Sequence, residues 1–193
     1  FMQDEFGWKR ETSALSFGII ILILGMPTVL FFKYGVFDEY DYWAGTVSLV
    51  VFALVESVLF AWVFGINKGW REITLGSDIR LPGIYKFIIK YITPALLLAV
   101  FLGALVTPEG GDWSRALSGD WVLDNSSIIR QVTNFGLRQE IAAATDLTVK
   151  AALEKKLLYV TGSRLLLLAV FFAICYLVFV AHRRRKKLAT VKP

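Results

Sequence analysis

The chain is poor in the residues from which catalytic and metal sites are most often built. Its 193 residues include one cysteine, Cys175, and one histidine, His182. A single cysteine excludes a disulfide within the chain, and one histidine beside a basic tail leaves no spacing typical of metal ligands. No serine or cysteine has a base at a spacing that suggests a nucleophile. We therefore expect neither an enzyme nor a bound metal or other cofactor.

Charged side chains are also scarce, at 19% of the chain, whereas 56% of the residues are hydrophobic and 15% are aromatic. A soluble domain of this length needs no such excess of apolar residues. About 20 helical residues cross the hydrocarbon core of a bilayer, which is about 30 Å thick. Four apolar segments are close to or above that length, namely residues 14–32, 42–66, 84–106 and 164–181. The sequence predicts an all-α integral membrane protein with four transmembrane helices.

Lysine and arginine gather in alternate connections between these segments, and such clusters mark the cytoplasmic side. The clustered residues are Lys9, Arg10, Lys68, Arg71, Arg80, Lys86, Lys90, Arg183, Arg184, Arg185, Lys186 and Lys187. We therefore expect residues 1–13, 67–83 and 182–193 in the cytoplasm, and the connections 33–41 and 107–163 outside a plasma or inner membrane. The basic tail is what this rule demands, so we expect no nucleic-acid partner, and anionic lipid is the favoured secondary ligand.

The connection 107–163 is the one long polar region. Apolar residues recur at loosely helical spacing from about residue 126 to 159, which predicts one or two amphipathic helices, with an N-cap among Asp124, Asn125 and Ser126. A cap over a vestibule and a packed connector with a solvated face both fit this pattern.

Glu56 lies in the middle of the second apolar segment. A charge there costs roughly 2.5–3.5 kcal/mol on insertion scales, so it needs protein, water or a hydrogen-bond partner beside it. On a helical wheel Glu56 shares one face with Asp41, Gly45, Leu49 and Phe52. We expect that face to look into protein. Glu56 fits a buried structural carboxyl or a role in ion or proton passage, and Asp41 fits a helix N-cap, an interfacial charge or a gate.

A family resemblance appears in the same region. The segments DEYDYWAG, VESVLFAWVFGINKGWREI, IRLPGIYKFIIKYITPALL and VFVAHRRRKK resemble, in this order, parts of the last four transmembrane helices of bacterial neurotransmitter:sodium symporters of the leucine-transporter type. Residues 1–10 look like the cytoplasmic link after the family's eighth helix, and residues 14–32 look like its ninth. The resemblance implies a fragment of a twelve-helix, inverted-repeat transporter fold, with further sequence before Phe1.

For single residues the resemblance implies less. Asp41 matches the aspartate that closes the family's extracellular gate with an arginine of the first helix, and Phe37 matches a position bordering the outer vestibule. Glu56 matches an acidic position without direct substrate contact. The family's substrate and sodium sites lie on helices that this chain lacks, so Na⁺ is implied only for the complete transporter.

The expected function is therefore the C-terminal scaffold and outer-gate portion of a sodium-dependent symporter for amino acids or related small amines. Its expected partners are the missing first eight helices, the lipid bilayer and a second copy bound through residues 14–32 and 164–181. The chain alone is not expected to transport. A self-standing four-helix membrane subunit with an accessory or assembly role is the alternative.

Overall fold

The computed structural model describes residues 1–76, 78 and 81–191. Within these residues the chain is helical, and the only extended pairing is an isolated bridge between Pro108 and Leu123. In the described part, four helices are long and apolar enough to cross a membrane: Arg10–Leu30, Val36–Val63, Ile84–Leu105 and Leu147–Arg185. The predicted all-α class with four spans is confirmed.

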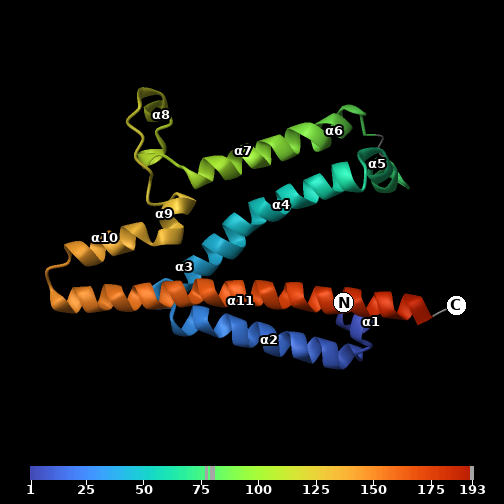
Figure 1. Cartoon of the computed structure of the whole chain (residues 1–193), viewed down its shortest axis with the longest axis horizontal. Helices are drawn as coiled ribbons and strands as arrows, with labels where there is room; N and C mark the ends of the chain where they lie inside the picture. The colour runs from blue at the N-terminus through green and yellow to red at the C-terminus, as the bar shows by residue number, and fades with distance from the viewer. Residues whose placement is uncertain (77, 79–80, 192–193) are drawn as a thin grey trace. The chain divides into compact units, whose positions relative to one another are not determined.

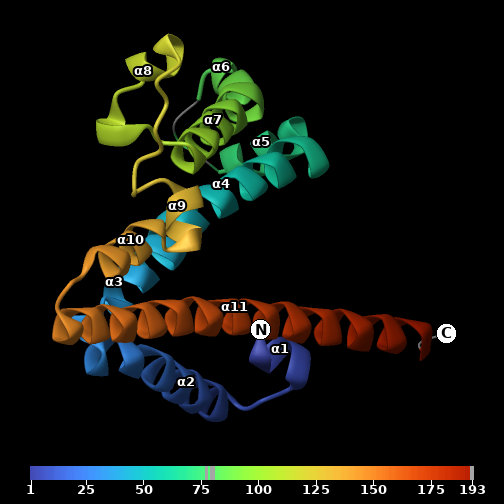
Figure 2. The same ribbon diagram turned by 60° about the vertical axis from the view of Figure 1, so that its left-hand side comes forward.

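The chain divides into two compact units. The first unit is Phe1–Trp43 with Glu154–Pro193, and it contains α1 (Met2–Phe6), α2 (Arg10–Leu30), α3 (Val36–Tyr40) and most of α11 (Leu147–Val191). In this unit α2 runs alongside α11 in the opposite direction (Figures 1 and 2). The ring of Tyr159 on α11 stacks between Phe31 and Tyr34, with centroid separations of 4.5 and 4.4 Å. Aromatic stacking therefore joins the end of α2 to α11.

The second span begins earlier than predicted. A 3₁₀ turn, Phe32–Tyr34, ends at Gly35, whose φ of 78° is one that glycine adopts readily, and α3 begins at Val36. A π-helical turn (Asp41–Val47), α4 (Ser48–Val58) and a second π-helical turn (Leu59–Val63) continue the same helix. The predicted connection 33–41 was therefore wrong in its second half. Its acidic residues suggested a loop, but acids in a first turn favour a helix by interacting with the helix dipole.

The last helix also begins earlier than predicted. α11 runs without a break from Leu147, so the second amphipathic segment and the predicted span 164–181 are one helix of 45 residues. Asp146 starts it, because its Oδ1 accepts hydrogen bonds from the Thr148 backbone N–H and hydroxyl, both at 2.7 Å. The predicted boundary between the outer connection and the membrane span at residue 163 stays a prediction. Within α11 the polar residues before the apolar run occupy mostly exposed helical positions.

The second unit, Ala44–Leu153, is built on α4 and α7 (Thr93–Leu105), which lie side by side in Figures 1 and 2. α5 (Ile66–Thr74) and α6 (Ile84–Phe87) join their ends, and a π-helical turn, Ile88–Ile92, leads into α7. Gly69 lies against Phe60, where a Cβ would come within 2.5 Å of the ring, so only glycine fits there without rearrangement.

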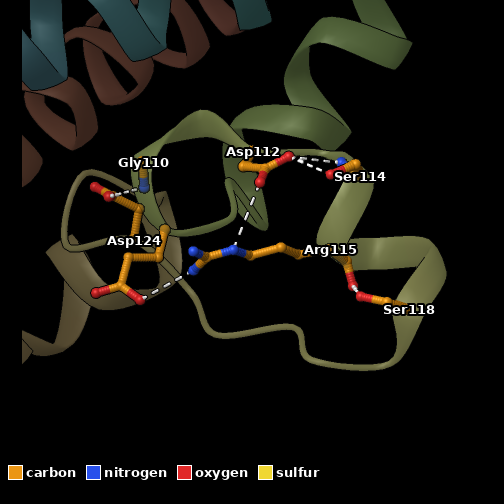
Figure 3. A network of polar contacts seen from close by, with 7 residues as sticks. Gly110, Asp112, Ser114, Arg115, Ser118 and Asp124 are labelled. Carbon is orange, nitrogen blue, oxygen red and sulfur yellow. Dashed lines mark hydrogen bonds and ion pairs between the residues drawn. The ribbon is translucent and has the colours of Figure 1, made fainter.

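The polar region after α7 is held by short-range hydrogen bonds (Figure 3). It contains a 3₁₀ turn, Glu109–Gly111, and α8 (Ser114–Ser118), α9 (Ile128–Thr133) and α10 (Phe135–Ala143). Asp124 accepts from the backbone N–H groups of Gly110 and Ser126 at 3.1 and 2.8 Å. These hydrogen bonds lower the pKa of the Asp124 carboxyl, the Ser126 backbone contributing most. The N-cap of α9 is Ser127, one residue after the predicted group.

The predicted sidedness of the connections stays a prediction. Arg80 lies outside the described residues, as do residues 192–193 and the side chains of Lys186 and Lys187. Of the tail, Arg185 pairs with Glu5, and the Arg184 guanidinium lies 5.3 Å from the centre of the Phe6 ring. The basic tail thus contacts α1 at the beginning of the chain.

We expect Asp146→Ala to fray the first turn of α11, because the Thr148 donors lose their acceptor. Hydrogen–deuterium exchange of residues 147–150 should accelerate, whereas Asp146→Asn, which keeps an acceptor, should exchange nearly as wild type. The Thr148 hydrogen bonds lower the pKa of Asp146, chiefly through the hydroxyl. The cap should therefore be fully present above the ordinary carboxyl pKa and be lost as the pH falls through the lowered one. Unchanged exchange in Asp146→Ala would contradict this assignment.

Candidate functional site

Asp41, the predicted gate residue, is the first residue of the π-helical turn in the second span. Its backbone is right-handed helical, with φ −62° and ψ −45°, and the helix begins five residues earlier. The N-cap interpretation of Asp41 was therefore wrong, because an N-cap residue precedes the helical turns. Its side chain is exposed. π-Helical turns inside α-helices are frequent at functional sites, which fits a functional carboxylate here.

The predicted stripe along the second span is an exposed face. Each of its members is exposed: Asp41, Gly45, Leu49, Phe52 and Glu56. Leu49 is 67% and Phe52 is 50% exposed. Residues on the other side of the helix, such as Val50, Leu54 and Ser57, are partly covered. The chain's own helices therefore pack against one side of this helix and leave the acidic side open.

Glu56 was expected to be buried, and within this chain it is exposed. Among the described residues its carboxylate makes no hydrogen bond or ion pair. A lone carboxylate in mid-membrane is costly, so an exposed Glu56 is unusual on a helix of membrane-spanning length.

Phe37 lies one turn before Asp41, on α3. Its side chain is 49% exposed, and its ring centre is 5.9 Å from that of Phe32. Phe37 and Asp41 thus lie one helical turn apart at the beginning of the second span, and Glu56 lies farther along the same helix.

The strongest polar contact in this region was not predicted. Glu39 on α3 accepts two hydrogen bonds from the Arg164 guanidinium on α11: Nε donates to Oε2 at 2.6 Å and Nη2 donates to Oε1 at 3.0 Å. The Trp43 indole N–H donates to the same Oε2 at 2.8 Å, and the guanidinium lies 5.3 Å from the centre of the Trp43 ring. We call Glu39, Trp43 and Arg164 the Glu39 cluster.

The Glu39 cluster is largely shielded from solvent. The side chains of Arg164 and Glu39 are 14% and 12% exposed. A two-point pair in a shielded place is strong, and removing one partner typically costs about 3–5 kcal/mol because the other charge is left alone. One sequence signal could have found it: Arg164 is the single charge directly before the most apolar run of the chain, and a charge in that position needs a partner.

We expect Arg164→Met to lower the free energy of unfolding by about 3–5 kcal/mol, because Glu39 would remain as an unpaired charge. Adding Glu39→Gln should recover most of that loss. Unfolding in mixed micelles measures the stability of the single and the double variant. As the control, Arg183→Met changes an exposed arginine on the same helix and should alter the free energy of unfolding by only about 0.5 kcal/mol. Equal losses in the single and double variants would show that the pair is not coupled.

Four apolar helices, one with acids along an exposed face, define the chain as part of an all-helical multi-pass membrane protein. The model of the sodium:neurotransmitter symporter family matches residues 2–123, more than half of the chain. The chain belongs to this family.

Named relatives agree with this assignment. The sodium- and chloride-dependent GABA transporter 2 of Rattus norvegicus is 28% identical over 164 residues, which cover 74% of this chain and 27% of the rat protein. Its Homo sapiens counterpart is 28% identical over 131 residues, covering 63% and 21%. The sodium-dependent nutrient amino acid transporter 1 of Drosophila grimshawi is 25% identical over 104 residues, covering 54% and 16%. The chain therefore spans about a quarter or less of the length of these relatives.

Proposed function

We propose that this chain is the C-terminal portion of a sodium-dependent symporter for amino acids or related small amines, of the leucine-transporter type, and forms its last four transmembrane helices. The observation that carries the proposal is the family match over residues 2–123, combined with relatives of which the matched part is only 16% to 27%. Those relatives are named as sodium-dependent transporters of amino acids or GABA. The substrate and Na⁺ sites then belong to the preceding helices.

The proposed role of the exposed acidic face is to contact those helices. A membrane-length helix that leaves Asp41 and Glu56 uncovered calls for partners that tolerate charge, and lipid chains do not. The missing first eight helices supply such partners in this proposal. Glu56 serves there as a structural carboxyl that hydrogen-bonds across a helix interface.

Asp41 is proposed as the gate residue at the outer entrance. Its exposed carboxylate at the start of the π-helical turn can pair with an arginine of the first helix when the entrance closes. Phe37, one turn away, borders the same entrance. Sodium drives the cycle by stabilising one conformation over the other, and the gate contributes by favouring the outward-closed state.

The same proposal gives the membrane, the sidedness of the two ends and the contacts of the outer helix faces. The chain lies in the plasma or inner membrane with both ends in the cytoplasm. The apolar outer faces of residues 14–32 and 164–181 are proposed to contact lipid or a second copy of the transporter.

The first test is to translate the DNA upstream of the Phe1 codon and to measure uptake. An open frame with eight further spans is expected, and its full product in liposomes should take up amino acids or small amines only with an inward sodium gradient. The 193-residue chain alone should show no sodium-dependent uptake, because every core helix is missing. A stop codon just before a start at Met2 would instead support the self-standing subunit, and uptake by the short chain would contradict the proposal.

We expect Asp41→Ala in the full-length transporter to reduce sodium-dependent uptake at least tenfold, because the outer entrance no longer closes tightly. Substrate binding in sodium should persist, since the binding helices are intact. Asp38→Ala is the matched control: it removes an exposed acid from the preceding turn of the same helix and should keep at least half of the uptake. Normal uptake and normal closure in Asp41→Ala would remove the gate assignment.

A further inference from the structure

The Glu39 cluster lies in the same helical turn as the proposed gate residue. Glu39 and Trp43 are four residues apart and face α11, where their shared contact with Arg164 lies. Asp41 is two residues from each of them, which on a helix is about 200° around the axis. The structure agrees with this geometry, because Asp41 is exposed while Glu39 is 12% exposed. One side of the turn is held by α11, and the opposite side carries Asp41.

Apolar packing alone leaves this turn loosely held. Val36 is 1% exposed, but a pocket of about 290 Å³ lies beside it, lined by residues of α2, α3 and α11 that include Tyr40, Tyr159 and Ser163. The Tyr40 hydroxyl has no hydrogen-bond partner in the described part of the chain. Close-packed interiors resist sliding and rotation, whereas a contact with a pocket in it resists them less. The orientation of α3 against α11 therefore depends on the polar contact.

A two-point ion pair fixes the orientation of α3 against α11, which loose apolar packing does not fix. The planar guanidinium donates two hydrogen bonds to the two oxygens of one carboxylate, so the pair specifies direction as well as distance. The Trp43 indole donates to the same carboxylate, which ties the next helical turn to it. Apolar side chains of similar volume could supply equal stability, but they would leave rotation of the helix free.

We propose that Arg164 and Glu39 are positioning residues for the outer gate: the pair holds the turn that carries Asp41 in the orientation needed for closure. The proposal rests on the function proposed above, and it gives α11 a part in gating beyond that of a scaffold. Arg164 lies outside residues 2–123, to which the family model extends.

Helix geometry sets how far the Asp41 carboxylate moves when its turn rotates. A carboxylate lies about 6 Å from the helix axis, so a rotation of the turn by about 20° moves it by about 2 Å. A displacement of that size takes a hydrogen-bonded ion pair beyond contact distance. Loss of the Glu39 cluster should therefore weaken closure without touching the substrate or sodium sites.

The experiment measures closure directly in the full-length transporter. Phe37→Cys, in a background without other reactive cysteines, reports access to the entrance through its rate of reaction with a charged thiol reagent. With sodium and substrate present, Arg164→Gln and Glu39→Gln should each react at least fivefold faster than the Phe37→Cys parent. Maximal uptake should fall at least fivefold, while the substrate concentration at half-saturation stays within twofold of the parent.

Three further variants separate positioning from general damage. Arg164→Lys keeps the charge but not the two-point geometry, so its reaction rate should lie between those of the parent and Arg164→Gln. The exchange Glu39→Arg with Arg164→Glu should return closure at least halfway to the parent value. Arg183→Gln removes an arginine that stacks on Phe179 of the same helix and should leave closure and uptake unchanged.

The outcomes also separate this inference from the proposed function. If the full-length parent transports with sodium and Arg164→Gln closes as the parent does, the positioning role is overturned and the proposed function stands. If the full-length transporter with Phe37 intact shows no sodium-dependent uptake, the proposed function is overturned, and the inference falls with it. Should the single variants fold too poorly to assay, closure by the exchanged pair decides: no recovery there overturns the inference.

Discussion

An unpaired charge is costly in hydrocarbon, and the arrangement of this chain follows from that cost. Backbone groups satisfy the constraint by forming helices throughout the apolar segments. Charged side chains satisfy it by finding partners, and Glu39 finds one in Arg164, 125 residues away in the sequence. Asp41 and Glu56 remain exposed on a membrane-length helix. Of these three acids, Glu39 is therefore paired within the chain, whereas Asp41 and Glu56 are exposed.

The two sides of the second span therefore differ: one side packs against other helices of the chain, and the other side is exposed. In the first unit, one side of α3 packs against α11 through Val36, Tyr40 and the Glu39 cluster. In the second unit, one side of α4 packs against α7. The opposite side is open in both. The named relatives are longer than this chain, and in the proposed function their additional helices cover such an open side.

Much of the fold could be predicted because hydropathy and periodicity are local properties. Four apolar segments predicted four spans. The helical wheel placed the acids of the second span on one face and predicted that this face looks into protein, but within this chain the face is exposed. Two helices begin earlier than predicted where charged residues suggested loops. α3 begins at Val36 because Gly35 ends the preceding turn, and α11 begins at Leu147 because Asp146 caps it. In both places a local feature, the Gly35 turn or the Asp146 cap, set the start of the helix although the residues there are polar. Composition alone does not reveal such features.

The sequence by itself determined the class of protein, the number of spans and the position of Asp41 and Glu56 on one face of the second span, because hydropathy and helical period depend only on neighbouring residues. Only the tertiary structure decided which acid of DEYDYWAG is paired within the chain. Glu39 and Asp41 are chemically similar and two residues apart, and nothing local distinguishes them. The distinction arises because α11 brings Arg164 to one side of the turn, and a contact between residues so far apart in sequence exists only in the folded chain.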